Sequence, residues 1–219
     1  MAAPRILVIN PNSSVHVTDG IDRACEPLRS LGGATIDCFT NPEGPPGIET
    51  QAHVDTVARH NAALVAAHGD YDAYVLACYS DPGLAACREV TSKPVLGISE
   101  SGILTALMVG HRFGVLAILA TSIPRHLRYM GSLGVLDRLA GERPVGLGVV
   151  ELADEDKTFD RLVSTGEALR DVDGADVLVM GCAGMADYRA RLAEATGIPV
   201  VEPTQAAVAM AIGRVSLGW

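Results

Sequence analysis

The chain has few aromatic residues and no long apolar segment free of charge. Of its 219 residues only three are Phe, one is Trp and five are Tyr, although 48% are hydrophobic. Ala, Val, Leu and Ile must therefore build most of the core. The most apolar stretch, residues 102–120, is interrupted by His111 and Arg112, which argues against a membrane span there. The N-terminal residues lack a signal-peptide pattern, so we expect a cytoplasmic protein.

Basic clusters are also absent. The chain carries 17 Lys and Arg against 26 Asp and Glu, a net charge of −9, and its Lys and Arg form no run. A nucleic-acid-binding protein would normally show a basic stripe. We expect a small-molecule substrate and a homo-oligomer, and neither a nucleic-acid nor a membrane partner.

Motifs that would hold a metal ion or a cofactor are missing as well. The six histidines show neither HExxH nor a Cys/His ligand spacing, and no Gly-Lys-Ser/Thr phosphate loop occurs. We therefore expect no metal and no cofactor. The five cysteines form no CxxC pair, and an odd number in an unsecreted chain indicates reduced thiols. They are Cys25, Cys38, Cys78, Cys87 and Cys182.

Short apolar segments alternate along the chain with stretches of helical periodicity. Residues 5–10, 73–78 and 145–150 have the pattern of buried strands, whereas residues 15–31 and 51–68 have that of helices. Near-continuous apolar strands between helices are typical of parallel sheets covered on both faces. The sequence therefore predicts an α/β fold.

The two halves of the chain resemble each other. The segment ending at Cys78 parallels the one ending at Cys182, 104 residues later, and Pro94 parallels Pro199 at an offset of 105. A constant offset near half the length predicts two similar lobes, each a parallel sheet flanked by helices. We expect a pseudo-twofold axis with the active site between the lobes. The predicted lobes are residues 1–100 with 204–219, and residues 101–203.

Cys78 and Cys182 come at the ends of equivalent predicted strands. Ligands of open α/β sheets bind beyond the carboxyl ends of the strands, so the two thiols are expected to face one crevice from opposite sides. One thiolate could then take a proton from a carbon while the other thiol protonates the opposite face. Asp81 and Pro82 have the pattern of an N-cap and first residue of a helix over 82–90, whose N-terminus would favour a thiolate at Cys78. An ordinary thiol pKa of about 8.5 would suit such acid–base work.

Three motifs together resemble the hydantoin/allantoin racemases of the aspartate/glutamate racemase superfamily, over essentially the whole chain. They are Ile-Asn-Pro-Asn-Ser-Ser at residues 9–14, Ala-Cys-Tyr-Ser-Asp-Pro-Gly-Leu at 77–84 and Met-Gly-Cys-Ala-Gly-Met at 180–185. The resemblance implies a cofactor-independent racemase in which Cys78 and Cys182 are the two bases. It also implies substrate contacts from loop residues and from Ile48, whose segment closes over the ring. The loop residues are Asn10, Ser80, Thr121, Ser122 and Gly184.

Departures from related enzymes bear on the substrate. Amino-acid racemases of the superfamily tend to carry Asp in the first loop, with Cys-Asn-Thr and Cys-Thr-His at the cysteines. Here those places read Asn10, Cys78-Tyr-Ser and Cys182-Ala-Gly, which removes groups expected to bind a free amino acid. Arylmalonate decarboxylases keep only one cysteine, so Cys78 argues against that activity. Tyr79-Ser80 replaces the Phe-Gly common in hydantoin racemases and leaves the 5-substituent open.

The sequence thus favours racemisation at C5 of a 5-substituted hydantoin, with allantoin as one candidate. An amino-acid racemase and a maleate cis–trans isomerase of the same superfamily are alternatives. A non-catalytic small-ligand binding protein is an alternative from another class. Such a protein needs neither cysteine, so thiol alkylation would leave its ligand affinity largely intact apart from steric block.

Overall fold

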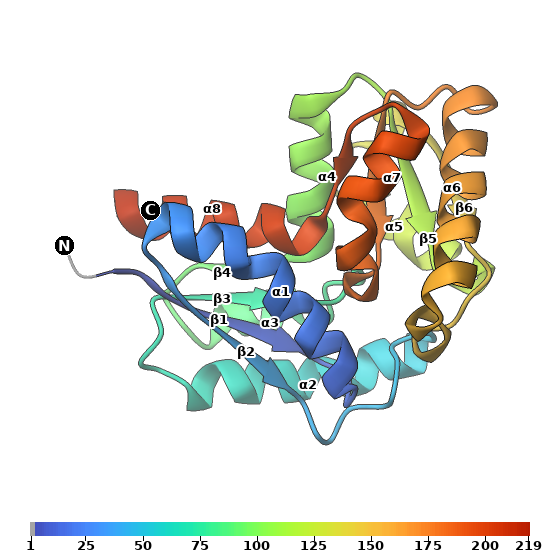
Figure 1. The fold of residues 1–219 in the computed structure, drawn as a ribbon. Coiled ribbons are helices and arrows are strands. Elements are labelled where there is room, and N and C mark those ends of the chain that lie inside the picture. The colour runs from blue at the N-terminus through green and yellow to red at the C-terminus, as the bar shows by residue number, and fades with distance from the viewer. Residues whose placement is uncertain (1–2) are drawn as a thin grey trace.

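Two four-stranded parallel sheets form the framework of the protein (Figure 1). The computed structural model describes residues 3–219. The strand order is β2-β1-β3-β4 in the first sheet and β6-β5-β7-β8 in the second, so equivalent strands occupy equivalent places. This confirms the predicted α/β fold of two similar lobes. The strands are β1 (Arg5–Asn10), β2 (Thr35–Thr40), β3 (Ala73–Leu76), β4 (Val95–Gly97), β5 (Phe113–Ala117), β6 (Leu139–Pro144), β7 (Val177–Gly181) and β8 (Val200–Val201).

Helices cover both faces of each sheet. The α-helices are α1 (Val15–Gly32), α2 (Gln51–Ala67), α3 (Leu84–Glu89), α4 (Ile98–Val109), α5 (Ile123–Ser132), α6 (Glu155–Asp171), α7 (Arg189–Thr196) and α8 (Pro203–Leu217). Short 3-10 helices lie at η1 (Ala120–Ser122), η2 (Leu136–Arg138), η3 (Val150–Ala153) and η4 (Ala183–Tyr188). Among the described residues, no helix has the length and apolarity needed to cross a membrane.

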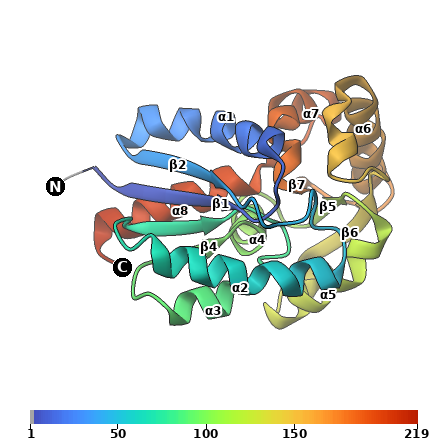
Figure 2. The same ribbon diagram turned by 90° about the horizontal axis from the view of Figure 1, so that it is seen from below.

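Alternation along the central strands explains the layers of the first lobe. Successive side chains of a strand point to opposite faces. In β1, Ile6 and Val8 join the core cluster that contains residues of α1 and α8, whereas Leu7 and Ile9 join the cluster beneath α2 and α3. Figure 2 shows α1 on one side of this sheet and α2 and α3 on the other. The continuous apolar run of β1 is therefore needed to fill both layers.

The helix that follows the last strand of each sheet packs on the other sheet. α4 follows β4 of the first sheet, yet its Ile103 and Ala106 pack in a cluster with Val177 and Val179 of β7. α8 follows β8 of the second sheet and returns to contact β1, β3 and β4. In Figure 1, α8 (red) runs along the first lobe while α4 (green) stands with the second. The division into residues 1–100 with 204–219 and residues 101–203 stays a prediction about folding units.

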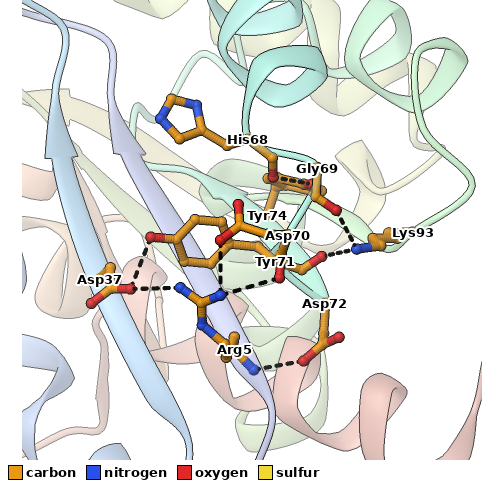
Figure 3. A network of polar contacts seen from close by, with 9 residues as sticks. All are labelled: Arg5, Asp37, His68, Gly69, Asp70, Tyr71, Asp72, Tyr74 and Lys93. Carbon is orange, nitrogen blue, oxygen red and sulfur yellow. Dashed lines mark hydrogen bonds and ion pairs between the residues drawn. The ribbon is translucent and has the colours of Figure 1, made fainter.

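A polar network joins the amino ends of the first sheet's strands, away from the strand ends that carry the cysteines (Figure 3). Arg5 at the start of β1 donates through its backbone N–H to Asp72 (2.8 Å) and through Nη1 to Asp70 (2.8 Å). Its guanidinium lies 4.6 Å from the centre of the Tyr71 ring, and the Tyr71 hydroxyl donates to Asp37 of β2. These contacts tie the turn before β3 to the neighbouring strands.

The predicted strand over residues 145–150 is wrong. The sixth strand is β6 (Leu139–Pro144), which lies at the edge of its sheet. Its polar residues interrupt the apolar pattern that is typical of buried strands. The alternating apolar residues after β6 do not form a strand, because Gly146 turns the chain with φ of 80°. The side chains of Val145, Leu147 and Val149 are buried in the core, but these residues belong to no strand.

Candidate active site

The two predicted catalytic cysteines line one cavity between the lobes. Cys78 follows β3 and Cys182 follows β7, the equivalent strands of the two sheets. The space at this site, open solvent included, amounts to about 400 Å³, and both thiols form part of its wall. Cys25, Cys38 and Cys87 do not line it. The carboxyl ends of the central strands thus bring together two groups that lie far apart in the sequence.

Burial makes both thiols weaker acids than a free cysteine. Burial raises the pKa of Cys78 to about 11, against the opposing effects of the Ser80 N–H and hydroxyl and the Arg125 guanidinium. Burial likewise raises the pKa of Cys182 to about 12. The Gly184 N–H donates to its sulfur at 3.4 Å and opposes that rise, while a charge on Cys78 adds to it. Both cysteines are therefore thiols at neutral pH, and only a small fraction of the pair is ionised.

The predicted helix start beside Cys78 is wrong. α3 begins at Leu84 after Gly83, not at Pro82. The carboxylate of Asp81 instead accepts hydrogen bonds from the backbone N–H groups of Ser99 and Glu100 at the start of α4 (2.9 and 2.8 Å). This close approach requires glycine at position 97, where a Cβ would lie 2.2 Å from the Asp81 Cγ. The long-range partners of Asp81 therefore outweigh its local capping pattern, and α3 does not begin beside Cys78 as predicted.

Four of the six predicted substrate-contact residues lie in the cavity wall: Ile48, Ser80, Ser122 and Gly184. The Ser122 hydroxyl is buried and has no hydrogen-bond partner in the described part of the chain. Its hydrogen-bonding capacity is therefore unused within the described structure. Ile48 is buried beside the cavity, and the neighbouring Glu49 carboxylate accepts the N–H of Val149 from the other lobe (2.8 Å). That bond joins the two segments on either side of the cavity.

The other two predicted contacts, Asn10 and Thr121, lie outside the cavity wall. The Asn10 amide is 1% exposed, and its Nδ2 donates to Asn12 Oδ1 (3.0 Å) and Thr18 Oγ1 (3.0 Å). Asn10 therefore shapes the loop, and Asn12 from the same motif lines the cavity. Thr121 is exposed to solvent in the middle of the 3-10 helix η1, whose last residue, Ser122, is buried.

A polar group of residues from the second lobe was not predicted from the sequence. Arg125 and His126 line the cavity, and the Arg125 Nε donates to Ser80 Oγ across the lobes at 3.0 Å. His126 Nδ1 lies 2.6 Å from Glu142 Oε1 of β6, with side chains 5% and 1% exposed. The His126 ring also meets the Tyr79 ring edge-on at 5.2 Å. The position of Arg125 in the sequence could have indicated its role. It follows β5 closely, and β5 is the equivalent of β1, the strand that leads into the loop of Asn12.

Loss of His126 is expected to destabilise the fold. His126→Leu would leave Oε1 of the buried Glu142 without its hydrogen-bond partner, at a cost of at least about 1–3 kcal/mol in the free energy of unfolding. Asp173→Asn is the matched control, because it breaks the more exposed pair with Arg143 (2.6 Å) and should lower the free energy of unfolding much less. Urea unfolding of both variants measures the difference. Equal losses would show that the His126–Glu142 pair contributes no more than a surface pair.

Comparison with known proteins places the chain in a family. Residues 6–211, from β1 into α8, match the Asp/Glu/hydantoin racemase family. The chain belongs to the Asp/Glu/hydantoin racemase family. It is 33% identical to a hydantoin racemase from Paenarthrobacter aurescens, and the alignment covers 98% of this chain and 92% of the relative. The resemblance inferred from the three sequence motifs is thereby confirmed.

Solved racemase structures share the fold. An allantoin racemase from Pseudomonas fluorescens superposes with a TM-score of 0.93 at 30% identity, covering 98% of this chain and 92% of that one. An allantoin racemase from Klebsiella pneumoniae gives 0.89 at 29% identity, covering 99% and 89%. The two-lobe arrangement of this racemase-family chain is thus that of solved family members over nearly its whole length.

Proposed function

We propose that the protein racemises a 5-substituted hydantoin at C5 by proton transfer between Cys78 and Cys182, without a cofactor. The observation that carries the proposal is the placement of two thiols from equivalent strands of opposite lobes in the wall of one cavity. A racemase needs an acid and a base on opposite faces of the same carbon. The hydantoin and allantoin racemases to which the chain is similar support this substrate class.

The proposed reaction balances over the two thiols. The ionised cysteine takes the C5 proton, and the resulting planar carbanion is conjugated with the neighbouring carbonyl. The other cysteine, still a thiol, then protonates the opposite face and becomes the thiolate. Each turnover exchanges the roles of the pair, so the next substrate of the opposite hand meets the base it requires. The free hydroxyl of Ser122 is suited to hydrogen-bond the ring.

Free amino acids fit the cavity poorly. Its wall contains no Asp or Glu among the described residues, so an α-ammonium group would have no carboxylate partner there. Burying an unpaired charge costs several kcal/mol. The cavity is therefore better suited to a hydantoin ring, whose N–H and C=O groups are uncharged, than to glutamate or aspartate.

A panel of pure enantiomers tests the proposal. We expect loss of optical rotation with at least one of allantoin and the benzyl-, isopropyl- and methylthioethyl-hydantoins, after subtraction of the spontaneous rate. Glutamate and aspartate are expected to react at least about 10³-fold more slowly, because the described cavity wall offers no carboxylate to pair with their ammonium group. Faster turnover of glutamate than of every hydantoin would make the amino-acid racemase alternative the correct one.

A further inference from the structure

Arg125 places a positive charge in the cavity wall without a matching anion. It lies in the first turn of α5, and its half-buried side chain makes one hydrogen bond, from Nε to Ser80 Oγ. Burial lowers its pKa, as expected for a cation shielded from water, but a guanidinium remains charged at any pH of interest. Within residues 3–219 it forms no ion pair. Its four Nη–H groups are therefore available to a ligand.

The charge around the cavity favours a negatively charged ligand. The protein as a whole carries a net charge of −9, yet the described lining has no acidic side chain. The Glu142 carboxyl group also acts on Arg125, but it lies outside the cavity wall and is paired with His126. A cation held in a shielded site without a counter-ion gains most when the ligand supplies the negative charge.

A neutral hydantoin acquires negative charge only as its C5 proton leaves. That charge moves onto the oxygen of the carbonyl next to C5, which becomes an enolate oxygen. We propose that Arg125 is a catalytic residue whose guanidinium, anchored by Ser80, hydrogen-bonds this oxygen as the charge develops. The inference rests on the proposed hydantoin reaction and adds the electrostatic group that a cofactor would otherwise supply. Fixed charges of this kind act most strongly in sites from which water is excluded.

A binding experiment separates this role from an effect of Arg125 on the Cys78 thiolate. In the full chain carrying Cys78→Ser and Cys182→Ser, no thiolate remains in the cavity. The probes are tetramic acid, a five-membered ring that is a planar enolate anion at neutral pH, and uncharged hydantoin. Calorimetry is expected to show tighter binding of tetramate. Arg125→Gln should reduce the tetramate-to-hydantoin affinity ratio by roughly 10- to 100-fold, the loss of a charge-assisted hydrogen bond.

Arg128→Gln is the matched control. Arg128 carries the same charge three residues later on α5, is exposed, and lies outside the cavity wall. Its removal should change the affinity ratio by less than about twofold, because salt screens exposed charges. An equal change with both variants, or no change with Arg125→Gln, would overturn the assignment. If the glutamine variant fails to fold, Arg125→Lys takes its place, because lysine keeps the charge but lacks the planar guanidinium. It should give an intermediate tetramate-to-hydantoin affinity ratio. An unchanged affinity ratio would count against the proposal.

Turnover distinguishes failure of this inference from failure of the proposed function. With both cysteines present, Arg125→Gln should lower kcat about 10²- to 10³-fold and leave KM for a neutral hydantoin nearly unchanged. If the unmodified protein racemises hydantoins and Arg125→Gln retains full kcat, the inference is wrong and the proposed function stands. If no hydantoin is racemised but tetramate binding depends on Arg125, the anion site stands and the proposed function is wrong.

Discussion

Replacing either Cys78 or Cys182 with serine is expected to lower the rate of racemisation by about 10²- to 10⁴-fold, the usual contribution of a general acid or base. A serine hydroxyl is a far weaker acid than a thiol, even a thiol whose pKa burial has raised. The rate is measured by polarimetry on a hydantoin that the unmodified protein racemises. Both variants should fail alike, because each removes one of two groups that must act in the same turnover.

Cys38→Ser is the matched control for these variants. It makes the same sulfur-to-oxygen change in the first lobe, on β2 and away from the cavity wall, so racemisation should stay close to that of the unmodified protein. Retention of most of the activity by Cys78→Ser or Cys182→Ser would show that one thiol is sufficient. The proposed exchange of protons between two cysteines would then be wrong.

The activity is expected to rise about tenfold per pH unit between pH 7 and pH 9. The active form carries one thiolate and one thiol, and the pKa values of about 11 and about 12 keep the pair almost fully protonated at pH 7. Raising the pH therefore increases the ionised fraction tenfold per unit until the first pKa is approached. Above the second pKa both thiols ionise, the proton donor is lost, and activity falls.

The measurement is kcat/KM against pH at constant ionic strength, which reports the ionisations of the free protein. The spontaneous base-catalysed racemisation and the ionisation of the hydantoin ring are measured separately and subtracted. A profile that is flat from pH 7 to pH 9, or that falls in this range, would show that the active thiolate is already formed at neutral pH. Another interaction would then outweigh the rise in the pKa of the two cysteines that burial causes.

The lobes and the cysteine pair could be predicted because they depend on simple, repeated patterns. Apolar strands such as β1 fill layers on both faces of a sheet, so they leave a clear signal. The offset between Cys78 and Cys182 matches the repeated strand order of the two sheets. Since parallel strands present their carboxyl ends at one edge, the two thiols had to fall near each other once the lobes faced one another.

Residues whose roles depend on distant partners could not be predicted. Asp81 has the local pattern of a helix cap, but its partners are the N–H groups of Ser99 and Glu100, 18 and 19 residues later. Glu142 lies on a polar edge strand, and only the fold shows that it meets His126. In the Asn-Pro-Asn loop either amide could have lined the cavity. The hydrogen bonds of Asn10 hold it in the loop, and Asn12 lines the cavity instead.

Stereospecific deuterium exchange by the single-cysteine variants tests the central claim most directly. Each pure enantiomer of a hydantoin that the unmodified protein racemises is incubated in D₂O with Cys78→Ser or with Cys182→Ser, and loss of the C5–H signal is followed by proton NMR. Each variant keeps one thiol on one face of C5, so one variant should exchange only the L-substrate and the other only the D-substrate. Equal exchange of both enantiomers by one variant would mean that a single base reaches both faces, and it would contradict the placement of Cys78 and Cys182 on opposite sides of the carbon.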